Sequence, residues 1–453
     1  MDKQPKKSYS AYCDWDFYDA SLMVEYRQCM EEGKDAESLK GLFEAIQALP
    51  QGEHREKMAD VLFDLLQQLP TRRDYKYVEP STLEEIRALR PAAPSVLPAP
   101  DPDTLPDQLL GAWLGRIAGC VLGKCIEGCR TPELMRILEV GDNVPLHRYI
   151  TSADYEKLDD DEKDKVIPPY RRIFIDQCTA APSDDDTNYV VLGQLLIEQY
   201  GRDFTPANVA ALWVDKQSRN AYCTAERAAY LNFMKGYQPP ESALYQNPYR
   251  EWIGAQIRGD YFGYINPGDP ETAADMGFRD ASISHVKNGI YGEMFASAMI
   301  AAAAVEKDVE KVILHGLSQI PKTSRLYEQV MHIMDMYRNG ASLEEVRSYI
   351  HIEWNEYNAH DWCHTISNAE ICAMALLYGE GDFEKTICYA VQTGFDTDCN
   401  GATVGSVMGI MHGAKSIPEK WTAPIHGKLD TTIFGVSRID LYEAAQRTLS
   451  HLK

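Results

Sequence analysis

The segment Gly111-Ala-Trp-Leu-Gly-Arg-Ile-Ala-Gly-Cys-Val-Leu-Gly123 carries a glycine at every fourth position, and Gly401-Ala-Thr-Val-Gly-Ser-Val-Met-Gly-Ile-Met-His-Gly413 repeats the pattern. Glycine inside a helix costs about 1 kcal/mol relative to alanine, so four of them in one helix need a compensating contact. A spacing of four keeps the glycines near one helical face, where a second backbone can approach closely. The two segments therefore predict two central helices that pack tightly against each other.

Most of the chain after Leu109 also has helical periodicity. Apolar residues recur at helical spacing in Val190–Tyr200, Ile290–Val305, Ser324–Arg338, Leu343–His351, Asn368–Tyr378, Phe383–Thr393 and Ala402–Ala414. The sequence has no convincing alternating strand pattern bounded by turn residues. It therefore predicts an all-α fold.

The first hundred residues differ from the rest. Residues 15 to 70 contain two or three amphipathic helical patterns, and seven prolines follow between Pro80 and Pro106. So many prolines favour an extended linker. We predict an N-terminal helical region with a proline-rich linker at residues 1–102, and a main all-α domain at residues 103–453.

Two stretches of the main domain lack clear periodicity. The polar stretch Asp142–Lys165 contains four consecutive acidic residues and is typical of a solvated insertion. The stretch Gly236–Asp280 is rich in Gly, Pro, Tyr and Trp. Connections of this length inside a compact domain are usually functional, so we expect a long functional loop there.

The charge of the chain restricts its partners. The formal net charge is −23, from 68 acidic and 45 basic residues. Such a charge disfavours binding to nucleic acids and to anionic membranes. An anionic substrate would need local help from a metal ion or from backbone donors.

Cysteine usage and hydropathy suggest the compartment. Eleven cysteines occur without a C-x-x-C pair, which is typical of reduced thiols in a cytoplasm. No apolar stretch follows the basic start Met1–Lys7, so no signal peptide is expected. The apolar segment Met294–Val305 is too short to span a bilayer. We expect a cytoplasmic protein, and the sequence leaves its oligomeric state open.

Two acidic clusters, Asp184-Asp185-Asp186 and Asp396-Thr-Asp398, each precede a predicted helix. One aspartate at such a position is explained by helix capping and by the helix dipole. Five carboxylates exceed what capping needs, and they repel one another unless a cation or a proton neutralises them. Oxygen ligands of this kind favour Mg²⁺ or Mn²⁺. The clusters therefore predict a site for divalent cations.

Between Leu109 and Ala414 the chain resembles the ADP-ribosylglycohydrolase (DraG-like) family. The resemblance depends on five segments in this order: Gly115-Arg-Ile-Ala-Gly-Cys-Val-Leu-Gly-Lys-Cys-Ile-Glu127, Ser183-Asp-Asp-Asp-Thr187, Ser284-His285 with Asn288-Gly289, Gly381-Asp-Phe383, and Gly394-Phe-Asp-Thr-Asp-Cys-Asn-Gly401. It implies a compact orthogonal helical bundle with two Mg²⁺ or Mn²⁺ ions in a central cleft.

The resemblance also implies roles for individual residues. The metal ligands would be Asp184, Asp185, Asp186, Asp396 and Asp398, and the catalytic residues Asp185 and Glu127. The substrate-binding positions would be Gly123, His285, Asn288, Gly289 and Cys399. His285 has a simpler explanation as a hydrogen-bonded structural residue.

Three positions depart from the family pattern. Asp184 replaces a ligating threonine, Cys399 stands where another ligating threonine is usual, and Cys120 replaces an aspartate. A thiol is a poor ligand for a hard cation, and the extra carboxylate of Asp184 would offset that loss. These departures indicate a divergent subfamily.

The implied reaction is hydrolysis at the ribose anomeric carbon of a free or protein-linked ADP-ribose-like group. The cations would orient a water, and Asp185 or Glu127 would act as general base. Two alternatives stay open. One is a catalytically silent ADP-ribose-binding or structural protein on the same scaffold. The other is a different two-metal hydrolase that acts on a nucleotide-like substrate.

Other reactive side chains suggest weaker hypotheses. His360 and His364 are spaced to share a helical face and could bind Zn²⁺, but no fourth ligand is evident. Cys120, Cys125 and Cys129 lie beside the glycine segment, where small buried residues are expected. Cys399 has no neighbouring base in the sequence that would make it a nucleophile.

Overall fold

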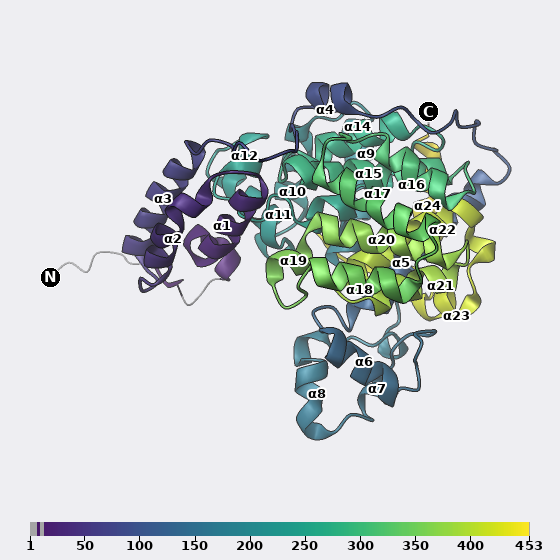
Figure 1. Ribbon diagram of the computed structural model, residues 1–453. Helices are drawn as coiled ribbons and strands as arrows, with labels where there is room; N and C mark the ends of the chain where they lie inside the picture. Colours follow the sequence, from purple (N-terminus) through teal and green to yellow (C-terminus); the bar gives the residue numbers. More distant parts are fainter. Residues whose placement is uncertain (1–6, 10–12, 453) are drawn as a thin grey trace.

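The computed structural model describes residues 7–9 and 13–452. These residues form a main body of packed helices, with a smaller group of N-terminal helices at its side and a lobe below it (Figure 1). The predicted all-α class is confirmed, apart from one short hairpin of two strands, β1 (Lys428–Ile433) and β2 (Val436–Asp440).

The main body contains long helices at its centre and shorter ones around them. They are α5 (Leu105–Lys124), α9 (Asp185–Tyr200), α10 (Pro206–Lys216), α11 (Thr224–Met234), α12 (Glu241–Leu244), α13 (Asp260–Tyr264), α14 (Pro270–Ala281), α15 (Lys287–Ala303), α16 (Val309–Leu317), α17 (Arg325–Arg338), α18 (Leu343–Glu353), α19 (Ala359–Cys363), α20 (Thr365–Gly379), α21 (Phe383–Gln392), α22 (Thr397–His412), α23 (Glu419–Thr422) and α24 (Leu441–Ser450).

The two glycine-spaced segments form α5 and α22, which make the most extensive helix contact in the described structure. A Cβ built on Gly119 would overlap the carbonyl of Gly401, and one on Gly115 would overlap the carbonyl of Gly405. Gly111 faces Gly409 in the same way. Because the partner number falls as the α5 number rises, the helices are antiparallel. The predicted close packing is therefore confirmed, and only glycine fits at these crossings.

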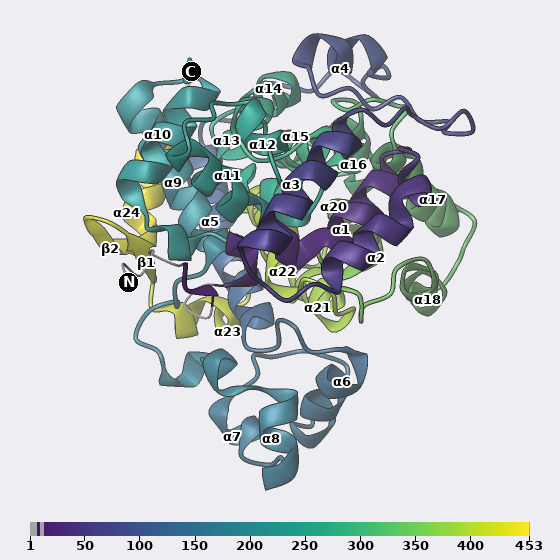
Figure 2. The ribbon, with the colours of Figure 1, turned by 90° about the vertical axis from the view of Figure 1, so that its left-hand side faces the viewer.

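The N-terminal helices α1 (Leu22–Glu31), α2 (Lys40–Gln47) and α3 (Glu53–Gln67) form a group in front of the main body in Figure 2. They enclose a small core of their own that includes Phe43 and Leu62. The stretch after them contains α4 (Leu83–Leu89) and is otherwise mostly irregular. The division of the chain at residues 102 and 103 stays a prediction.

Buried ion pairs attach the N-terminal helices to the main body. Arg250 contacts Glu25 of α1 and Glu32, the residue after α1, with N–O distances of 2.9 and 2.5 Å. Arg325 contacts Glu79 of the linker at 3.0 Å and Glu251 at 2.6 Å. All four carboxylates are buried. Breaking one such pair leaves an uncompensated buried charge, so the attachment is firm.

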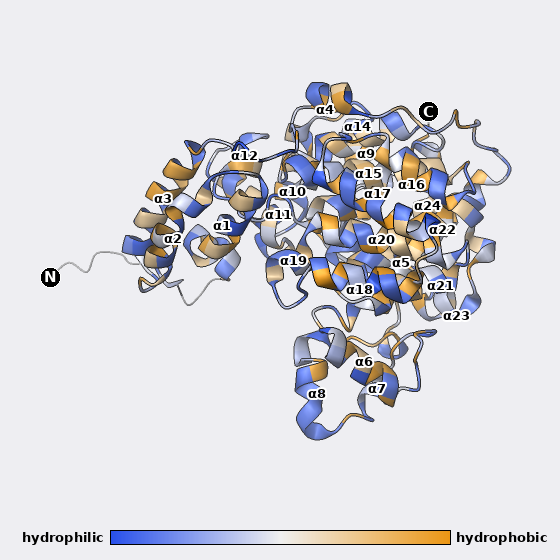
Figure 3. Ribbon diagram, viewed as in Figure 1, coloured by the Kyte–Doolittle hydropathy of each residue, from blue (hydrophilic) through white to orange (hydrophobic). Residues whose placement is uncertain are grey.

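The lobe below the main body contains α6 (Thr131–Val140), α7 (Ser152–Tyr155) and α8 (Asp160–Val166). It includes the stretch predicted as a solvated insertion. Most of α8 is hydrophilic (Figure 3), and the Asp160 side chain is 99% exposed. The lobe nevertheless buries apolar residues such as Leu134 and Val166 against the main core.

One expectation about the main body was wrong. The stretch Gly236–Asp280 is not a long loop, because it contains α12, α13 and most of α14. Residues 249–264 are buried without a break, so these turns have no polar face that would reveal a helix. The β1–β2 hairpin is a short addition to the all-α fold that no alternating pattern indicated. Among the described residues, every helix is too short or too polar to cross a lipid bilayer.

Candidate metal centre and active-site cavity

The two acidic motifs lie together because α5 contacts the start of both following helices. The Thr397 hydroxyl donates a hydrogen bond to the Gly123 carbonyl at 2.9 Å, at the first turn of α22. Arg116 of α5 donates to the Asp186 carbonyl at 2.8 Å, at the first turn of α9. The close α5–α22 packing thus brings together residues more than 200 positions apart in the sequence.

Five carboxylates and two thiols form three overlapping groups, each with ligand atoms within 4.8 Å of one another. The groups are Asp186, Asp398 and Cys399; Glu127, Asp396 and Asp398; and Cys120, Asp184 and Asp186. Asp186 and Asp398 each belong to two of them, so the three groups form one continuous cluster.

The carboxylates are short of hydrogen-bond partners. Asp186 and Asp398 are 0% and 2% exposed, and one oxygen of each, Oδ2 and Oδ1, has no partner in the described structure. Asp396 is the N-cap of α22, but its side chain makes no capping hydrogen bond. A buried, unpaired carboxylate oxygen is costly unless a cation or proton meets it. Capping therefore does not account for these aspartates, and the residues present fit divalent cations with oxygen ligands.

Proton affinities in the cluster reflect crowding of negative charge. Burial, followed by repulsion from neighbouring aspartates, raises the pKa of Asp185 and Asp396 well above the usual value. Burial also raises the pKa of Asp186, although the Arg116 guanidinium opposes the shift. Burial alone would raise the pKa of Asp184, but the nearby Lys124 ammonium lowers it overall. A divalent cation would relieve the same repulsion that protons relieve here.

Two basic side chains enter the acidic cluster. Lys124, at the end of α5, forms an ion pair with Asp184. Arg171, from a short turn in the lobe, forms an ion pair with Glu127, and its Nε has no hydrogen-bond partner in the described structure. Each pair sets a fixed positive charge beside a candidate ligand.

Arg116 of α5 holds Asp186 in position. Its guanidinium is 0% exposed and lies 3.3 Å from Asp186 Oδ1 and 2.7 Å from Asp260 Oδ2. The same group donates to the main-chain carbonyl of Asp186. Because one planar group holds both the backbone and the side chain of Asp186, the orientation of this candidate ligand is fixed.

A cavity of about 330 Å³ opens beside the acidic cluster. The candidate site residues in its wall are Glu127, Asp185, Asp396, Asp398 and Cys399. The wall also includes Trp15, Arg130, Arg171, Cys223, Thr224, Glu226, Trp252, Gly254 and Trp362, together with five other residues. This volume falls in the range of small-molecule sites.

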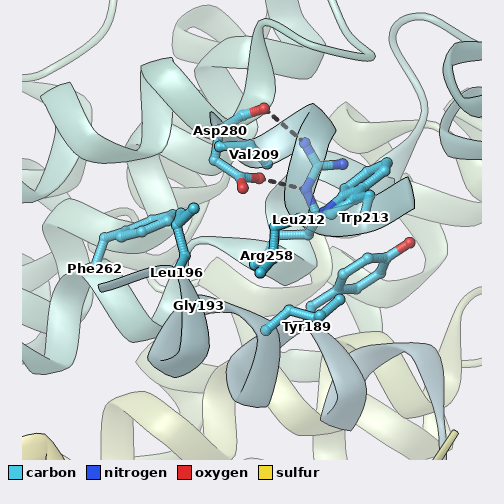
Figure 4. A pocket seen from close by; sticks show the side chains of 10 residues that line it. Tyr189, Gly193, Leu196, Val209, Leu212, Trp213, Arg258, Phe262 and Asp280 are labelled. Carbon is cyan, nitrogen blue, oxygen red and sulfur yellow. Dashed lines mark hydrogen bonds and ion pairs between the residues drawn. The ribbon is translucent and has the colours of Figure 1, made fainter. Parts of the chain in front are cut away.

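A second, internal cavity is shown in Figure 4 and has a volume of only about 10 Å³. It is lined by Arg258 and Asp280, joined by dashed lines in the figure, and by aromatic residues such as Trp213. A space of this size holds at most one water. Its role is structural, because Arg258 also binds Glu226 at 2.8 Å and thereby anchors one residue of the larger cavity.

Four predicted substrate-binding residues do not line the larger cavity. Gly123 lies against the backbone of α22. His285 is 0% exposed and hydrogen-bonds Ser284 at 2.8 Å, and burial followed by Arg258 lowers its pKa well below the usual value. Asn288 bonds Glu251 at 3.0 Å, and Gly289 lies against the Arg250 carbonyl. Packing accounts for all four, whereas the fifth, Cys399, is in the wall.

The zinc hypothesis for His360 and His364 conflicts with their hydrogen bonds. His360 Nδ1 accepts from the Trp252 indole at 3.0 Å, and His364 Nδ1 accepts from a backbone N–H at 3.1 Å. Because both donors occupy Nδ1, both Nε2 atoms carry the proton. They face Glu31 Oε2, at 3.0 and 3.5 Å. A zinc ligand needs an unprotonated Nε2, so we interpret the two histidines as partners of the Glu31 carboxylate of α1, to which His360 is hydrogen-bonded.

Several residues of the site were not predicted. Arg116 and Lys124 are charged residues within an otherwise apolar, glycine-spaced segment, and this contrast was a usable signal. Arg171 and Trp15 lie in irregular segments with no local pattern that indicates a site. Only the packing of the lobe and of the N-terminal region places them at the cavity.

The model of one protein family, ADP-ribosylglycohydrolase, matches residues 101–451. The chain belongs to the ADP-ribosylglycohydrolase family. Every carboxylate of the cluster lies within the matched region, whereas Trp15 lies outside it.

Two known proteins are similar to this chain at low sequence identity. ADP-ribosylhydrolase ARH3 of Danio rerio is 29% identical over 134 residues, which are 28% of this chain and 34% of the relative. The alignment thus spans about a third of that relative's length. A solved structure described as an ADP-ribosylglycohydrolase-related protein complex is 19% identical, covers 77% of this chain and 98% of its own, and has a TM-score of 0.43. The identity of 29% to ARH3 fits a divergent member of the family.

Proposed function

We propose that this chain is a hydrolase that cleaves the glycosidic bond at the ribose anomeric carbon of an ADP-ribosyl conjugate. Its cofactors would be two divalent cations, Mg²⁺ or Mn²⁺. Their ligands would be drawn from Asp184, Asp185, Asp186, Asp396, Asp398 and Glu127. The observation that carries the proposal is the meeting of two acidic motifs at one cavity, with Asp398 shared by two ligand groups.

The residues of the cavity wall and of the acidic cluster would have different roles in the reaction. When bound, the cations supply a water of lowered pKa and binding positions for ribose hydroxyls. Asp185 lines the cavity, where its carboxylate would act as a general base that takes a proton from the attacking water. Glu127 is the second candidate base, but its carboxylate is held by Arg171. Arg116 keeps Asp186 in place throughout.

Two arginines would supply the positive charge that an acidic protein needs to bind an anionic substrate. Arg130 and Arg171 both line the cavity that contains the carboxylates. Guanidinium groups bind phosphate oxygens with two parallel hydrogen bonds. We assign them to the diphosphate of the substrate, where they would offset the negative charge of the cluster.

The test is hydrolysis of a panel of ADP-ribosyl conjugates, with arginine, serine, nucleic-acid and nucleotide linkages, in Mg²⁺, in Mn²⁺ and in EDTA. We expect cleavage of at least one linkage, inhibition by EDTA, and loss of both turnover and metal binding in Asp398→Asn. Asp160→Asn is the matched control, because that side chain is exposed on α8 and belongs to none of the ligand groups.

The outcomes separate the alternatives. Binding of ADP-ribose and metal without turnover of any linkage would favour a silent binding protein. Turnover of a phosphoester or another nucleotide instead would favour a different two-metal hydrolase. Calorimetry that detects no divalent cation in the unmodified protein would contradict the proposal.

A further inference from the structure

The N-terminal region reaches the candidate active site through one residue, Trp15. It lies in a short 3-10 turn, Asp14–Asp16, and lines the same cavity as Asp185 and Asp398. It is the one residue before position 101, within the described part of the chain, that lines this cavity. The region matched by the family model therefore does not by itself complete the cavity of this protein.

A buried ion pair holds the Trp15 turn in place. Asp16, the next residue, accepts hydrogen bonds from Arg227 of α11 at 2.7 and 3.1 Å. Both side chains are nearly buried, with exposures of 5% and 7%. Asp16 also caps its own turn, because its carboxylate accepts from the Cys13 N–H at 3.2 Å. The same helix, α11, supplies Thr224 and Glu226 to the cavity wall, so Trp15 and the wall share one support.

Trp15 keeps an open face. Trp15 is 36% exposed, although the side chain of the neighbouring Asp16 is only 5% exposed. An indole that is fixed at its base and open on one side offers a rigid surface for a planar group, at low cost in conformational entropy.

The rest of the wall suits the same ligand chemistry. Trp362 lines the cavity, and the Arg130 guanidinium lies 5.5 Å from its ring centroid. The Trp362 indole N–H is buried and has no hydrogen-bond partner in the described structure. Aromatic faces beside a guanidinium are the means by which proteins bind a base and its phosphates.

We propose that Trp15 is a specificity-determining residue that stacks on the nucleobase of the substrate. The N-terminal region thereby takes part in substrate recognition. This inference rests on the proposed function, since it takes the substrate to be an adenine nucleotide derivative. It assigns to residues 13–16 a role that the family domain alone does not supply.

The test is calorimetric binding of ADP-ribose in Mg²⁺ and, separately, of Mn²⁺ alone. The variants are Trp15→Ala, Trp15→Phe and the control Met23→Ala, which changes an exposed apolar residue elsewhere in the N-terminal region. Stacking on one base contributes about 1–3 kcal/mol, so Trp15→Ala should weaken ADP-ribose binding by about 10-fold. Trp15→Phe should keep most of the affinity, and Mn²⁺ affinity should not change. Melting curves check that each variant is folded.

Three other results would each contradict either the role of Trp15 or the proposed function. If Trp15→Ala binds ADP-ribose as tightly as the unmodified protein, Trp15 only covers the cavity and the inference is overturned. If Mn²⁺ affinity falls in parallel, the residue supports the acidic cluster and does not contact a base, which also overturns it. If the unmodified protein binds Mn²⁺ but no ADP-ribose, the proposed function itself has failed.

Discussion

Lys124 and Asp184 form an ion pair inside the acidic cluster, where the Lys124 side chain is 14% exposed and that of Asp184 is 5% exposed. Asp184 is also the position at which this chain has a carboxylate in place of the threonine of the family pattern. The added negative charge is thus matched by a positive charge from α5. The ammonium group contacts a candidate metal ligand, so it would repel a divalent cation bound beside Asp184.

Replacing Lys124 with methionine should tighten binding of divalent cations. A unit charge at about 4 Å contributes between about 1 and 4 kcal/mol, depending on the local dielectric, so we expect a gain in affinity of about tenfold or more. Calorimetry with Mn²⁺ measures the gain. The metal-free variant should also melt at a lower temperature, because Asp184 is left buried and unpaired. Lys415→Met changes an 89% exposed lysine and should do neither. Weaker Mn²⁺ binding in Lys124→Met would show that the lysine supports the metal site.

Cys399 stands among the candidate ligands, and its thiol has a pKa raised well above the usual value by burial and by Asp186. Cys399→Thr replaces a poor ligand for hard cations with a hydroxyl oxygen. We expect Mg²⁺ affinity to rise by roughly tenfold, the scale on which groups at a metal site change affinity. Comparison of Mg²⁺ titrations of Cys399→Thr and Cys178→Thr tests this, because Cys178 lies outside the cavity wall. Equal affinities would mean that position 399 does not contact the cation.

The α5–α22 crossing should tolerate no side chain. A Cβ at position 119 would overlap the backbone of Gly401, so Gly119→Ala forces the two helices apart. Overpacking of this kind costs about 1–3 kcal/mol or more, and we expect a loss at the upper end of that range in chemical denaturation. Gly41→Ala is the control, because nothing lies within 4 Å of a Cβ there and position 41 is in helix α2. That change should stabilise its helix by up to about 1 kcal/mol. A neutral Gly119→Ala would contradict the backbone contact.

Glu370 makes stability depend on pH. Burial raises its pKa to about 8, although the Trp354 indole donates to one oxygen at 3.3 Å. The folded state therefore keeps a proton that the unfolded state has lost. This contribution to stability is complete below the ordinary glutamate pKa and is lost as pH rises towards about 8.

The loss should amount to about 1.4 kcal/mol per pH unit in that window. Glu370→Gln removes the titrating group, so the difference in unfolding free energy between the unmodified protein and this variant should fall between pH 5 and pH 8 and then level off. Denaturant titrations across this range measure it, with the exposed Glu139→Gln as a control. A constant difference would show that Glu370 is not protonated in the folded protein.

Much of the fold could be read from local patterns. The spacing of Gly111 to Gly123 and of Gly401 to Gly413 predicted the central helix pair, because glycine periodicity reports directly on which face is in close contact. The hairpin at Lys428–Asp440 was missed, since its strands are short and one pairs with Ala181 far away in the sequence. The helices within Gly236–Asp280 were missed because residues buried on all sides show no amphipathic period.

The sequence likewise indicated some residues of the candidate site and not others. The aspartates stand out because several carboxylates at one helix start exceed what capping requires. The predicted contacts of Gly123, His285, Asn288 and Gly289 with substrate were not supported by position, because those residues serve helix packing and buried hydrogen bonds. Sequence similarity identified the segments, but it did not separate residues that line a cavity from residues that support its wall.

The sequence by itself determined the all-α class, the pair of glycine-lined helices and the two acidic motifs, because each depends on spacing along one helix or at one helix end. Only the tertiary structure decided which groups share the cavity. It brought Lys124 to Asp184, Arg171 to Glu127 and Trp15 to the wall. The physical reason is that these contacts join segments 44 to several hundred residues apart, whose meeting depends on how whole helices pack.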